Sequence, residues 1–528
     1  MGSSDESKPS LLPEPSSPTQ PLLPSSSDLY QPISYTHSPR PIRDLPALLL
    51  FLLLSLSTFA LGFLALARRN PDSTRVSRFV YDPSLSSCVL ASKLATANLI
   101  SSSSALLKGL ISTLVLTFLF AAPISLLLLW LLKNYAKQVV YAAIPFFILT
   151  PAFLNIYWFV ACTVGDECRH AFPLAYRILV LVFVFLLIGV ILWIIVANWH
   201  RVELTIHIVR VAAAALAENL ALLVVLPVLG IGLLVYFAPI VVFLVFSTWN
   251  GEVVPKARKG GEYYSCVWRQ DGWVPAYFAL AIITMIWSAA TMVEAQVYVI
   301  SGTVAQWYFE KEGSKPSKSL RSSLRNAFGP SFGTVCFSGM VMGAIRFVRA
   351  VVDSAKHEDG VQGFVNLILK CCSTFLLSAI DFVNKFTVNF AAITGEGYCS
   401  SARMTYELLR RNLLSAVFVE TVSTRVLFGV IFVISALYAI VVCAILKAVS
   451  ALGVETYFVA ALAWLLLMVV LGYFVHVLDN VIDTVYVCYA IDRDKGDVSK
   501  QEVHEVYVQL PVSRNHGSTL NNRSPLTV

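Results

Sequence analysis

The sequence predicts an all-α, polytopic integral membrane protein with about ten transmembrane helices. Of its 528 residues, 57% are hydrophobic and only 13% are charged, whereas a typical soluble domain is about 45–50% apolar and about 25% charged. The mean hydropathy is +0.71. Because the apolar residues are gathered into runs long enough to cross a bilayer, we expect one membrane domain rather than a series of soluble domains.

Ten apolar runs carry this prediction, since a spanning helix needs about 20 apolar residues to cross roughly 30 Å of hydrocarbon. The runs lie at 45–67, 109–132, 139–163, 173–197, 219–247, 274–301, 329–351, 363–390, 426–447 and 454–478. Pro227 and Pro239 lie inside the fifth run and predict a kink or a break. The eighth run is the least apolar because it carries Lys370, Asp381 and Lys385. A re-entrant segment, or burial among other helices, is the alternative for that run.

Two tails flank the transmembrane domain at 45–490. Residues 1–44 are rich in Ser and Pro and cannot bury enough apolar surface to fold, so we expect a disordered N-terminal tail. Residues 491–528 form the C-terminal tail. The loop 311–325 carries five basic residues, and basic loops collect on the cytoplasmic side. With an even number of spans, both tails are then cytoplasmic, although the basic loop 68–108 opposes this orientation.

Four of the ten cysteines fall in or next to loops that this topology places outside, where disulfides form. They are Cys88, Cys162, Cys168 and Cys266. Cys162 and Cys168 are the favoured pair because they are close in the sequence. The chain has no CxxC motif, no zinc-ligand spacing and no haem motif, so we expect no metal and no cofactor.

One helix face in the sixth run is the candidate substrate site. Trp287, Thr291, Glu294 and Tyr298 follow at steps of four, three and four residues, which places them on one face of a helix. An ionisable residue inside a span is costly and usually functional. A quaternary ammonium such as choline has no N–H to donate and is held by aromatic faces and negative charge. The alternative is a packed aromatic stripe with Glu294 neutral or bonded to a neighbouring helix.

Further aromatic residues are candidates to close this site. Trp307 and Tyr308 lie at the end of the same run, where aromatic residues also form the belt at the membrane interface. Tyr398 is a third candidate. We therefore keep both interpretations, substrate contact and interfacial belt, for Trp307 and Tyr308.

Polar residues in two later runs are candidates for gating or relay. Asp479 and Asp483 are four residues apart and share a face with His476; they are either a gate or a cation or proton relay, or they are solvated because the helix has already left the membrane. Asp381 and Asn384 lie in the eighth run, and Asn389 lies near its end. They are candidates to line a water-filled path. The alternative is that arginines of the seventh run, 329–351, pair with such acids or extend to the membrane interface.

The C-terminal half resembles the choline transporter-like family. Four stretches carry the resemblance: SGTVAQWYFE at 301–310, SLRSSLRNAFGPSFGTVCFSGMVMGAIRFVR at 319–349, NKFTVNFAAITGEGYCSSARMTYELLRRN at 384–412 and DNVIDTVYVCYAIDRDKGD at 479–497. Arg43-Asp44-Leu45-Pro46 before the first run adds to it. The loop 68–108 departs from the large glycosylated loop of the animal members, because it is short and has no sequon. The C-terminal tail resembles the plant branch.

The resemblance implies a ten-helix transporter of the plasma membrane with cytoplasmic tails; an endomembrane is the alternative location. It implies uptake of choline, or of the related amine ethanolamine, without a nucleotide or sodium requirement. Transport is then facilitated or proton-linked alternating access in the lipid bilayer. An inside-negative potential favours entry of a cation by about 2.3 kcal/mol per charge per 100 mV.

Two other functions remain as alternatives. One is a membrane scaffold or trafficking factor, for which the Leu-Leu pairs at 11–12 and 22–23 and Cys371-Cys372 would supply sorting and acylation signals. The other is an intramembrane enzyme of lipid metabolism, but the chain has no HExxH, GxSxG or Walker motif. Basic residues form no stripe, so nucleic acid is not an expected partner. The sequence does not determine the oligomeric state.

Overall fold

The computed structural model describes residue 35 and residues 40–72, 79–82, 87–90, 104–165, 168, 172–257, 264–310, 319–358, 364–449 and 455–510. The Leu-Leu pairs, most of the predicted N-terminal tail, the side chains of Cys371 and Cys372, and the end of the C-terminal tail lie outside the described residues. The helices are α1 (Leu45–Ala67), α2 (Ser104–Val164), α4 (Leu174–Ala197), α5 (Trp199–Glu218), α6 (Ala221–Ser247), α7 (Val274–Phe309), α8 (Ser319–Ala327), α9 (Phe332–Glu358), α10 (Phe364–Thr394), α11 (Tyr398–Val449), α12 (Glu455–Lys495) and α13 (Gln501–Tyr507).

Within these ranges, nine helices are long and apolar enough to cross a membrane, which confirms the predicted fold class. The difference from ten arises at α2, which joins the two predicted runs 109–132 and 139–163. This helix has 61 residues and would be about 90 Å long if it were straight, far more than one bilayer crossing needs. Its backbone leaves the helical region at Tyr135, with φ −131° and ψ 31°.

Contacts with α11 establish that α2 folds back at Tyr135. Tyr438 donates a hydrogen bond to Thr117 on the first arm, while Phe432 stacks near Phe147 on the second arm, with ring centroids 5.9 Å apart. Thr117 and Phe147 would be about 45 Å apart on a straight helix, yet their partners are separated by only about 9 Å along α11. The two arms therefore correspond to the two predicted spans.

Two expectations for individual runs have different outcomes. Of the kink or break expected at Pro227 and Pro239, the break is absent, because α6 continues as one helix through both prolines. The helix tolerates the two prolines because they remove only two of its backbone hydrogen bonds. The predicted run 363–390 is the continuous helix α10 rather than a re-entrant segment.

The sequence reading missed helix α5, which lies between the spans α4 and α6. Its average hydrophobicity is well below that of its neighbours, so it was not recognised as an apolar run. One face carries buried residues such as Ile208, Ala212 and Leu216, while Arg201 and Arg210 are exposed. It packs against α2 and α12, and it connects the end of α4 to the start of α6.

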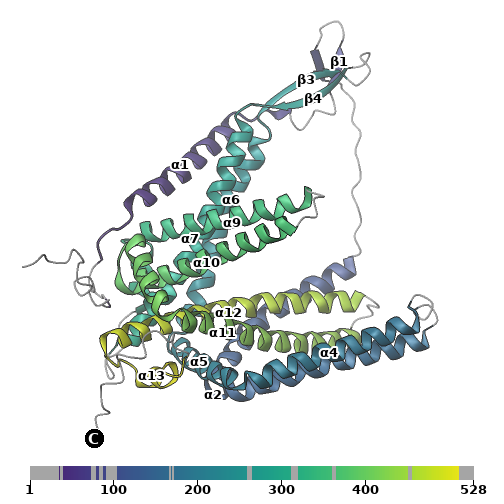
Figure 1. Cartoon of the computed structure of the whole chain (residues 1–528). Coiled ribbons are helices and arrows are strands. Elements are labelled where there is room, and N and C mark those ends of the chain that lie inside the picture. Colours follow the sequence, from purple (N-terminus) through teal and green to yellow (C-terminus); the bar gives the residue numbers. More distant parts are fainter. Residues whose placement is uncertain are drawn as a thin grey trace, which may run out of the picture.

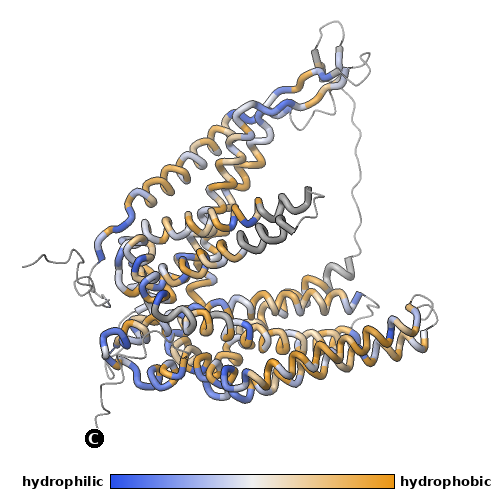
Figure 2. The backbone as a smooth tube through the Cα atoms, viewed as in Figure 1, coloured by the Kyte–Doolittle hydropathy of each residue, from blue (hydrophilic) through white to orange (hydrophobic). Residues whose placement is uncertain are grey.

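The helices gather at one end of the molecule and diverge toward the other (Figure 1). Here the tail end means the end where α1 begins and α12 finishes, and the hairpin end means the opposite one, which carries strands β1 (Phe79–Asp82) to β4 (Tyr264–Gln270). Apolar residues run along the diverging arms, and hydrophilic residues concentrate at the two ends (Figure 2). Trp193 on α4 is 70% exposed and Leu234 on α6 is 66% exposed. Such large apolar surfaces fit lipid rather than water.

One disulfide bond joins the two hairpins, and a second closes the turn between α2 and α4. Strand β1 pairs with β2 (Ser87–Leu90), and β3 (Gly251–Ala257) pairs with β4. Cys88 and Cys266 join the two hairpins, with their Cα atoms 5.9 Å apart. Cys162 and Cys168 form the second disulfide bond, as predicted. Both bonds lie at the end opposite the tails, as expected if that end faces an oxidising compartment.

Candidate functional site

Helix α10 lies at the centre of the polar part of the transmembrane domain and presents two neighbouring residues to different partners. Asn384 contacts α7, α9 and α11, whereas Lys385 contacts α12. Consecutive residues are turned by about 100° around a helix, so one helix can serve two clusters. We call them the Glu294 cluster and the Lys385 cluster.

The Glu294 cluster joins four helices around one carboxylate. Ser338 on α9 donates a hydrogen bond to Glu294 Oε2 at 2.9 Å, and Asn384 Nδ2 lies 3.4 Å from the same oxygen. Tyr398, the first residue of α11, donates to Asn384 Oδ1 at 2.6 Å. Glu294 is only 4% exposed. The structure therefore brings two predicted site residues, Glu294 and Tyr398, into one cluster, and Ser338 and Asn384 complete it.

Close packing of α7 on α9 creates this arrangement. A Cβ atom at Gly339 would lie 2.5 Å from Thr291 Oγ1, so only glycine permits the observed approach. Within the described chain, the Thr291 hydroxyl is buried without a hydrogen-bond partner. Such an unpaired polar atom is unusual in a buried site, and it lies one helical turn from Glu294.

Trp287 and Tyr298 are engaged with other parts of the protein. Trp287 Nε1 donates to the carbonyl of Cys336 at 3.0 Å, and its ring packs edge-to-face on Phe51 of α1, with centroids 5.4 Å apart. Tyr298 donates to Ser331 Oγ at 2.8 Å. Both rings are buried, so they form part of the helix packing around Glu294.

Trp307 and Tyr308 lie at the far end of α7, about 20 Å along the helix from Glu294. Trp307 Nε1 donates to Glu218 at 2.6 Å, and the Lys500 ammonium lies 5.4 Å from the centre of its ring. Tyr308 donates to Asp492 at 3.0 Å. These contacts attach the end of α7 to α5, α12 and the C-terminal segment. The structure thus does not bring Trp307 and Tyr308 to the Glu294 cluster.

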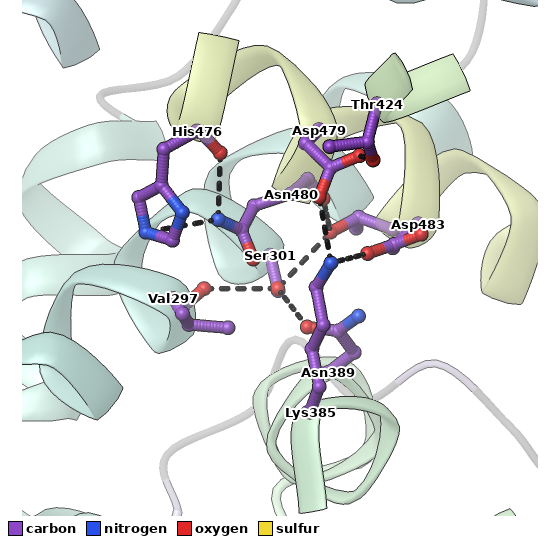
Figure 3. Close-up of polar contacts among 10 residues, drawn as sticks. Val297, Ser301, Lys385, Asn389, Thr424, His476, Asp479, Asn480 and Asp483 are labelled. Atoms are coloured by element: carbon purple, nitrogen blue, oxygen red, sulfur yellow. Dashed lines mark hydrogen bonds and ion pairs between the residues drawn. The ribbon is translucent and has the colours of Figure 1, made fainter. Parts of the chain in front are cut away.

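The Lys385 cluster contains both predicted acids of α12 (Figure 3). Lys385 Nζ lies 2.8 Å from Asp479 Oδ2 and 2.5 Å from Asp483 Oδ2, and Thr424 on α11 donates to Asp479 Oδ1 at 2.6 Å. The Asp479 side chain is 10% exposed and the Asp483 side chain is 0% exposed. The interpretation that these acids are solvated beyond the membrane is therefore wrong, because α12 continues to Lys495 and buries them.

A second polar layer lies one turn further along α10. The Ser301 hydroxyl is 2.8 Å from Asn389 Oδ1 and 3.0 Å from Thr484 Oγ1, so it connects α7, α10 and α12 (Figure 3). Asn389 is fully buried here. The remaining predicted acid, Asp381, lies 3.5 Å from Arg349 of α9, and both side chains are 40% exposed.

A short N-terminal segment crosses the tail end of these helices. This segment, residues 40–44, is called the strap. Arg40 donates one hydrogen bond to the Tyr298 hydroxyl and another, at 2.8 Å, to the carbonyl of Ala392. Asp44 accepts from Thr334 and from the backbone N–H of Tyr398, both at 2.7 Å. The strap therefore fastens α1 to α7, α9, α10 and α11.

Backbone geometry shows how closely the strap fits. A Cβ at Gly333 would lie 2.3 Å from the Arg43 carbonyl oxygen, and Gly395, at φ +77°, lies against the Arg40 side chain. Tyr35 stacks on Phe309, with ring centroids 5.0 Å apart, and burial raises the pKa of Tyr35 to about 12. The end of the predicted N-terminal tail thus makes specific contacts.

The sequence reading missed Ser338 and Arg40 as site residues. Ser338 precedes Gly339 in a segment that the family resemblance includes, but one hydroxyl in an apolar run gives no signal of its partner. Arg40 is three residues before the Arg43–Pro46 motif, which was the available signal that this segment has a role.

The comparisons with known proteins agree with this architecture. A family profile described as plasma-membrane choline transporter matches residues 180–494, more than half of the chain and all of the helices that build the two clusters. The chain belongs to the choline transporter-like family. The match begins in α4 and ends one residue before α12 does.

Individual relatives are distant. A choline transporter-like protein 5 of Macaca fascicularis is 27% identical over 259 residues, which is 46% of this chain and 35% of the relative. A CTL-like protein of Dictyostelium discoideum is 23% identical over 240 residues, 43% of each chain. Protein PNS1 of Gibberella zeae is 26% identical over 168 residues, 31% of each chain. The matched segments thus span less than half the length of these curated relatives.

Proposed function

We propose that this member of the choline transporter-like family transports choline or a related hydroxylated ammonium, such as ethanolamine, by alternating access. Membership of a transporter family supports this proposal at the level of membrane transport. The same membership favours transport over both alternatives, an enzyme and a trafficking factor. The substrate and the mechanism are argued from the two clusters.

The observation that carries the proposal is that the Glu294 carboxylate is surrounded by neutral hydrogen-bond partners. Within the part of the chain that the structure describes, the hydrogen-bond partners of Glu294 are the neutral groups Ser338 and Asn384. In contrast, Asp381 is paired with Arg349, and Lys385 is paired with the α12 acids. A buried carboxylate is normally paired with a cation. Arg346 of α9 is near enough to act on Glu294 electrostatically, but the two form no ion pair in the described part of the chain. Glu294 can therefore take a cation or a proton as its direct partner.

The surrounding groups suit a small ammonium that carries a hydroxyl group. Tyr398 belongs to the cluster and Tyr298 lies one helical turn after Glu294 on α7, and aromatic faces bind quaternary ammonium groups. The buried hydroxyl of Thr291, one turn before Glu294, supplies a hydrogen-bond partner for the hydroxyl of choline or ethanolamine. Substrate binding then requires these helices to separate, because the cluster is closed in this conformation.

The Lys385 cluster supplies a second place for a positive charge on the same path. Two carboxylates share one ammonium there, so the cluster has one negative charge in excess when both acids are ionised. We propose that it relays the substrate cation, or a proton coupled to it, between the Glu294 cluster and the tail end. The strap closes the tail end, since Arg40 bridges Tyr298 and the end of α10.

The proposed setting is the plasma membrane with both tails in the cytoplasm. The basic residues of α8 and of the first turns of α11 lie at the tail end, and the positive-inside rule places such residues in the cytoplasm. An inside-negative potential then drives the cation from the hairpin end to the tail end.

The test is uptake by purified protein in liposomes. We expect labelled choline to enter in a saturable manner when an inside-negative potential is imposed. Glu294→Gln keeps the size and the hydrogen bonds of the side chain but removes its charge, so we expect uptake to fall at least tenfold. Glu407→Gln, at a largely exposed ion pair with Arg403, is the matched control and retains the rate. Ethanolamine and tetramethylammonium as competitors test the role assigned to Thr291.

Two results would count against the proposal. Full uptake by Glu294→Gln would remove the electrostatic role of this residue. No uptake of choline or ethanolamine by folded, correctly inserted wild-type protein would favour the trafficking alternative.

A further inference from the structure

A cavity on the outside of the helix bundle lies away from both clusters. Its volume is 220 Å³, and it is lined by residues of α2, α4, α5 and α11. Ile144 and Phe147 of α2, Ile195 of α4, Val202 of α5 and Val430 of α11 are among its walls. We call it the lateral groove. Such an apolar surface on a spanning domain is in contact with lipid chains.

Arg425 is the one polar side chain among the residues that line the lateral groove. It belongs to the spanning part of α11, and its side chain is exposed. Among the described residues it has no hydrogen bond or ion pair, whereas Lys385 and Arg349 are both paired with acids. An unpaired arginine in a spanning helix is unfavourable in contact with lipid chains. An anionic partner from outside the chain would remove that cost.

The groove lies near the tail end of the bundle, where lipid head groups are found. Ile195 is three residues before Asn198, which joins α4 to α5, and Val202 is four residues after it. Val140 is five residues after Tyr135, where α2 folds back. These two connections mark the tail end on both sides of the groove. A guanidinium at this level can reach a phosphate by extending along the helix.

Arg201 adds positive charge at this end. It is exposed on α5, whereas the charge of Lys137 is balanced by Glu203 of α5 at 3.0 Å. An arginine binds phosphate through two parallel N–H···O bonds. The apolar side chains around it bind an acyl chain little better than other lipid chains do. Selectivity for one lipid therefore comes from the charge of its head group.

We propose that Arg425 and the lateral groove form a binding site for an anionic phospholipid, with the phosphate on Arg425 and part of one acyl chain in the groove. The site does not depend on the identity of the substrate. It adjoins the Lys385 cluster, because Thr424 donates to Asp479 and is the neighbour of Arg425 on α11. The bound lipid thereby steadies the part of α11 that holds this cluster.

Gly429 maintains the shape of the groove. A Cβ there would lie 3.2 Å from Phe147 Cε2, so a larger residue would push the Phe147 ring and alter one wall. The groove therefore depends on both the charge of Arg425 and the small residue one turn away from it.

The experiment compares lipids by thermal unfolding of the purified full-length protein in detergent, with native mass spectrometry to count bound lipids. We expect phosphatidylglycerol to raise the midpoint by several degrees more than phosphatidylcholine at equal concentration. Arg425→Gln should remove this difference and weaken lipid binding at least tenfold. Arg425→Lys keeps the positive charge but loses the two parallel N–H donors of the guanidinium, so it should retain part of the preference for phosphatidylglycerol. Arg210→Gln, at an exposed arginine of α5 that does not line the groove, is the control and should behave as wild type.

Three outcomes would overturn the proposal. Equal stabilisation of the wild-type protein by the two lipids would exclude selectivity for an anionic head group. An unchanged preference in Arg425→Gln would place the lipid elsewhere. Stabilisation by inorganic phosphate alone, equal to that of the lipid, would show that the groove holds no acyl chain. The wild-type comparison decides the first and third points even if Arg425→Gln fails to fold.

Discussion

The two central ionisable residues, Glu294, which is buried, and Lys385, which is partly buried, differ in how their charge is compensated. Lys385 lies between two carboxylates of α12, while Glu294 is held by neutral donors. Removing the cation from a buried ion pair costs more than the pair contributes, because an uncompensated charge remains. Loss of Lys385 should therefore lower the stability of the protein, whereas loss of Glu294 should lower the rate of transport.

Lys385→Met tests the first half of this distinction. The substitution leaves Asp479 and Asp483 close together without a counter-charge, so we expect the protein to lose about 3–5 kcal/mol of stability, measured as a lower unfolding midpoint in detergent. The double variant Lys385→Met with Asp483→Asn removes one of the two charges and should recover at least half of the loss. If Lys385→Met unfolds at the wild-type midpoint, the cluster does not contribute to stability.

Pairings of this kind could not be predicted from the sequence. Lys385 and Asp479 are 94 positions apart, and helix periodicity reports which residues share a face but not which helix covers that face. For the same reason the sequence predicts Glu294, Asn384 and Tyr398 as candidates but does not predict that Asn384 connects the other two. The sequence favours Trp307 as a site residue because it follows Glu294 on the same helix. The two residues are too far apart along α7 to contact one small substrate.

At the scale of elements, local signals predicted the spans well and the other helices poorly. Apolar runs of about 20 residues depend only on the neighbouring sequence, and all ten correspond to helices or helix arms. Helix α5 was missed because its burial comes from packing on α2 and α12 rather than from its own hydropathy. The composition of residues 1–44 likewise does not predict the order of the strap, because its contacts are with helices far along the chain.

The strap gives a prediction at this scale. Arg40→Gln removes charged hydrogen bonds that are worth about 1.5–3 kcal/mol, which corresponds to roughly 10- to 150-fold more opening of the strap. Limited trypsin digestion at Arg43 should become faster by about this factor, and choline exchange from the tail side should increase. The contact of Arg40 with Tyr298 is the reason to expect the second effect.

Glu396→Gln is the matched comparison for the strap. Its partner is Arg43, and the side chains are 43% and 41% exposed, so this ion pair should contribute less than about 1 kcal/mol. We expect digestion of Glu396→Gln to change by less than about fivefold. Equal digestion of Arg40→Gln and wild type would indicate that Arg40 does not fasten the strap.

At the scale of the whole molecule, charge and redox chemistry assign opposite roles to the two ends. The disulfide bond Cys88–Cys266 joins the hairpins, and Cys162–Cys168 closes the turn between α2 and α4; both fit an oxidising compartment. At the tail end, Cys399 is a free, exposed thiol close to the strap residue Asp44, which binds the neighbouring Tyr398. A reduced thiol near basic residues fits the cytoplasm.

Cys399 therefore reports the orientation of the protein in intact cells. A membrane-impermeant maleimide should leave Cys399 unlabelled until the plasma membrane is permeabilised, and the label that then appears should be absent from Cys399→Ser. Non-reducing mass spectrometry of the same cells should recover the Cys88–Cys266 and Cys162–Cys168 peptides linked. Labelling of Cys399 before permeabilisation would show that the orientation is the opposite of the proposed one. The potential would then oppose, rather than drive, movement of a cation from the hairpin end to the tail end.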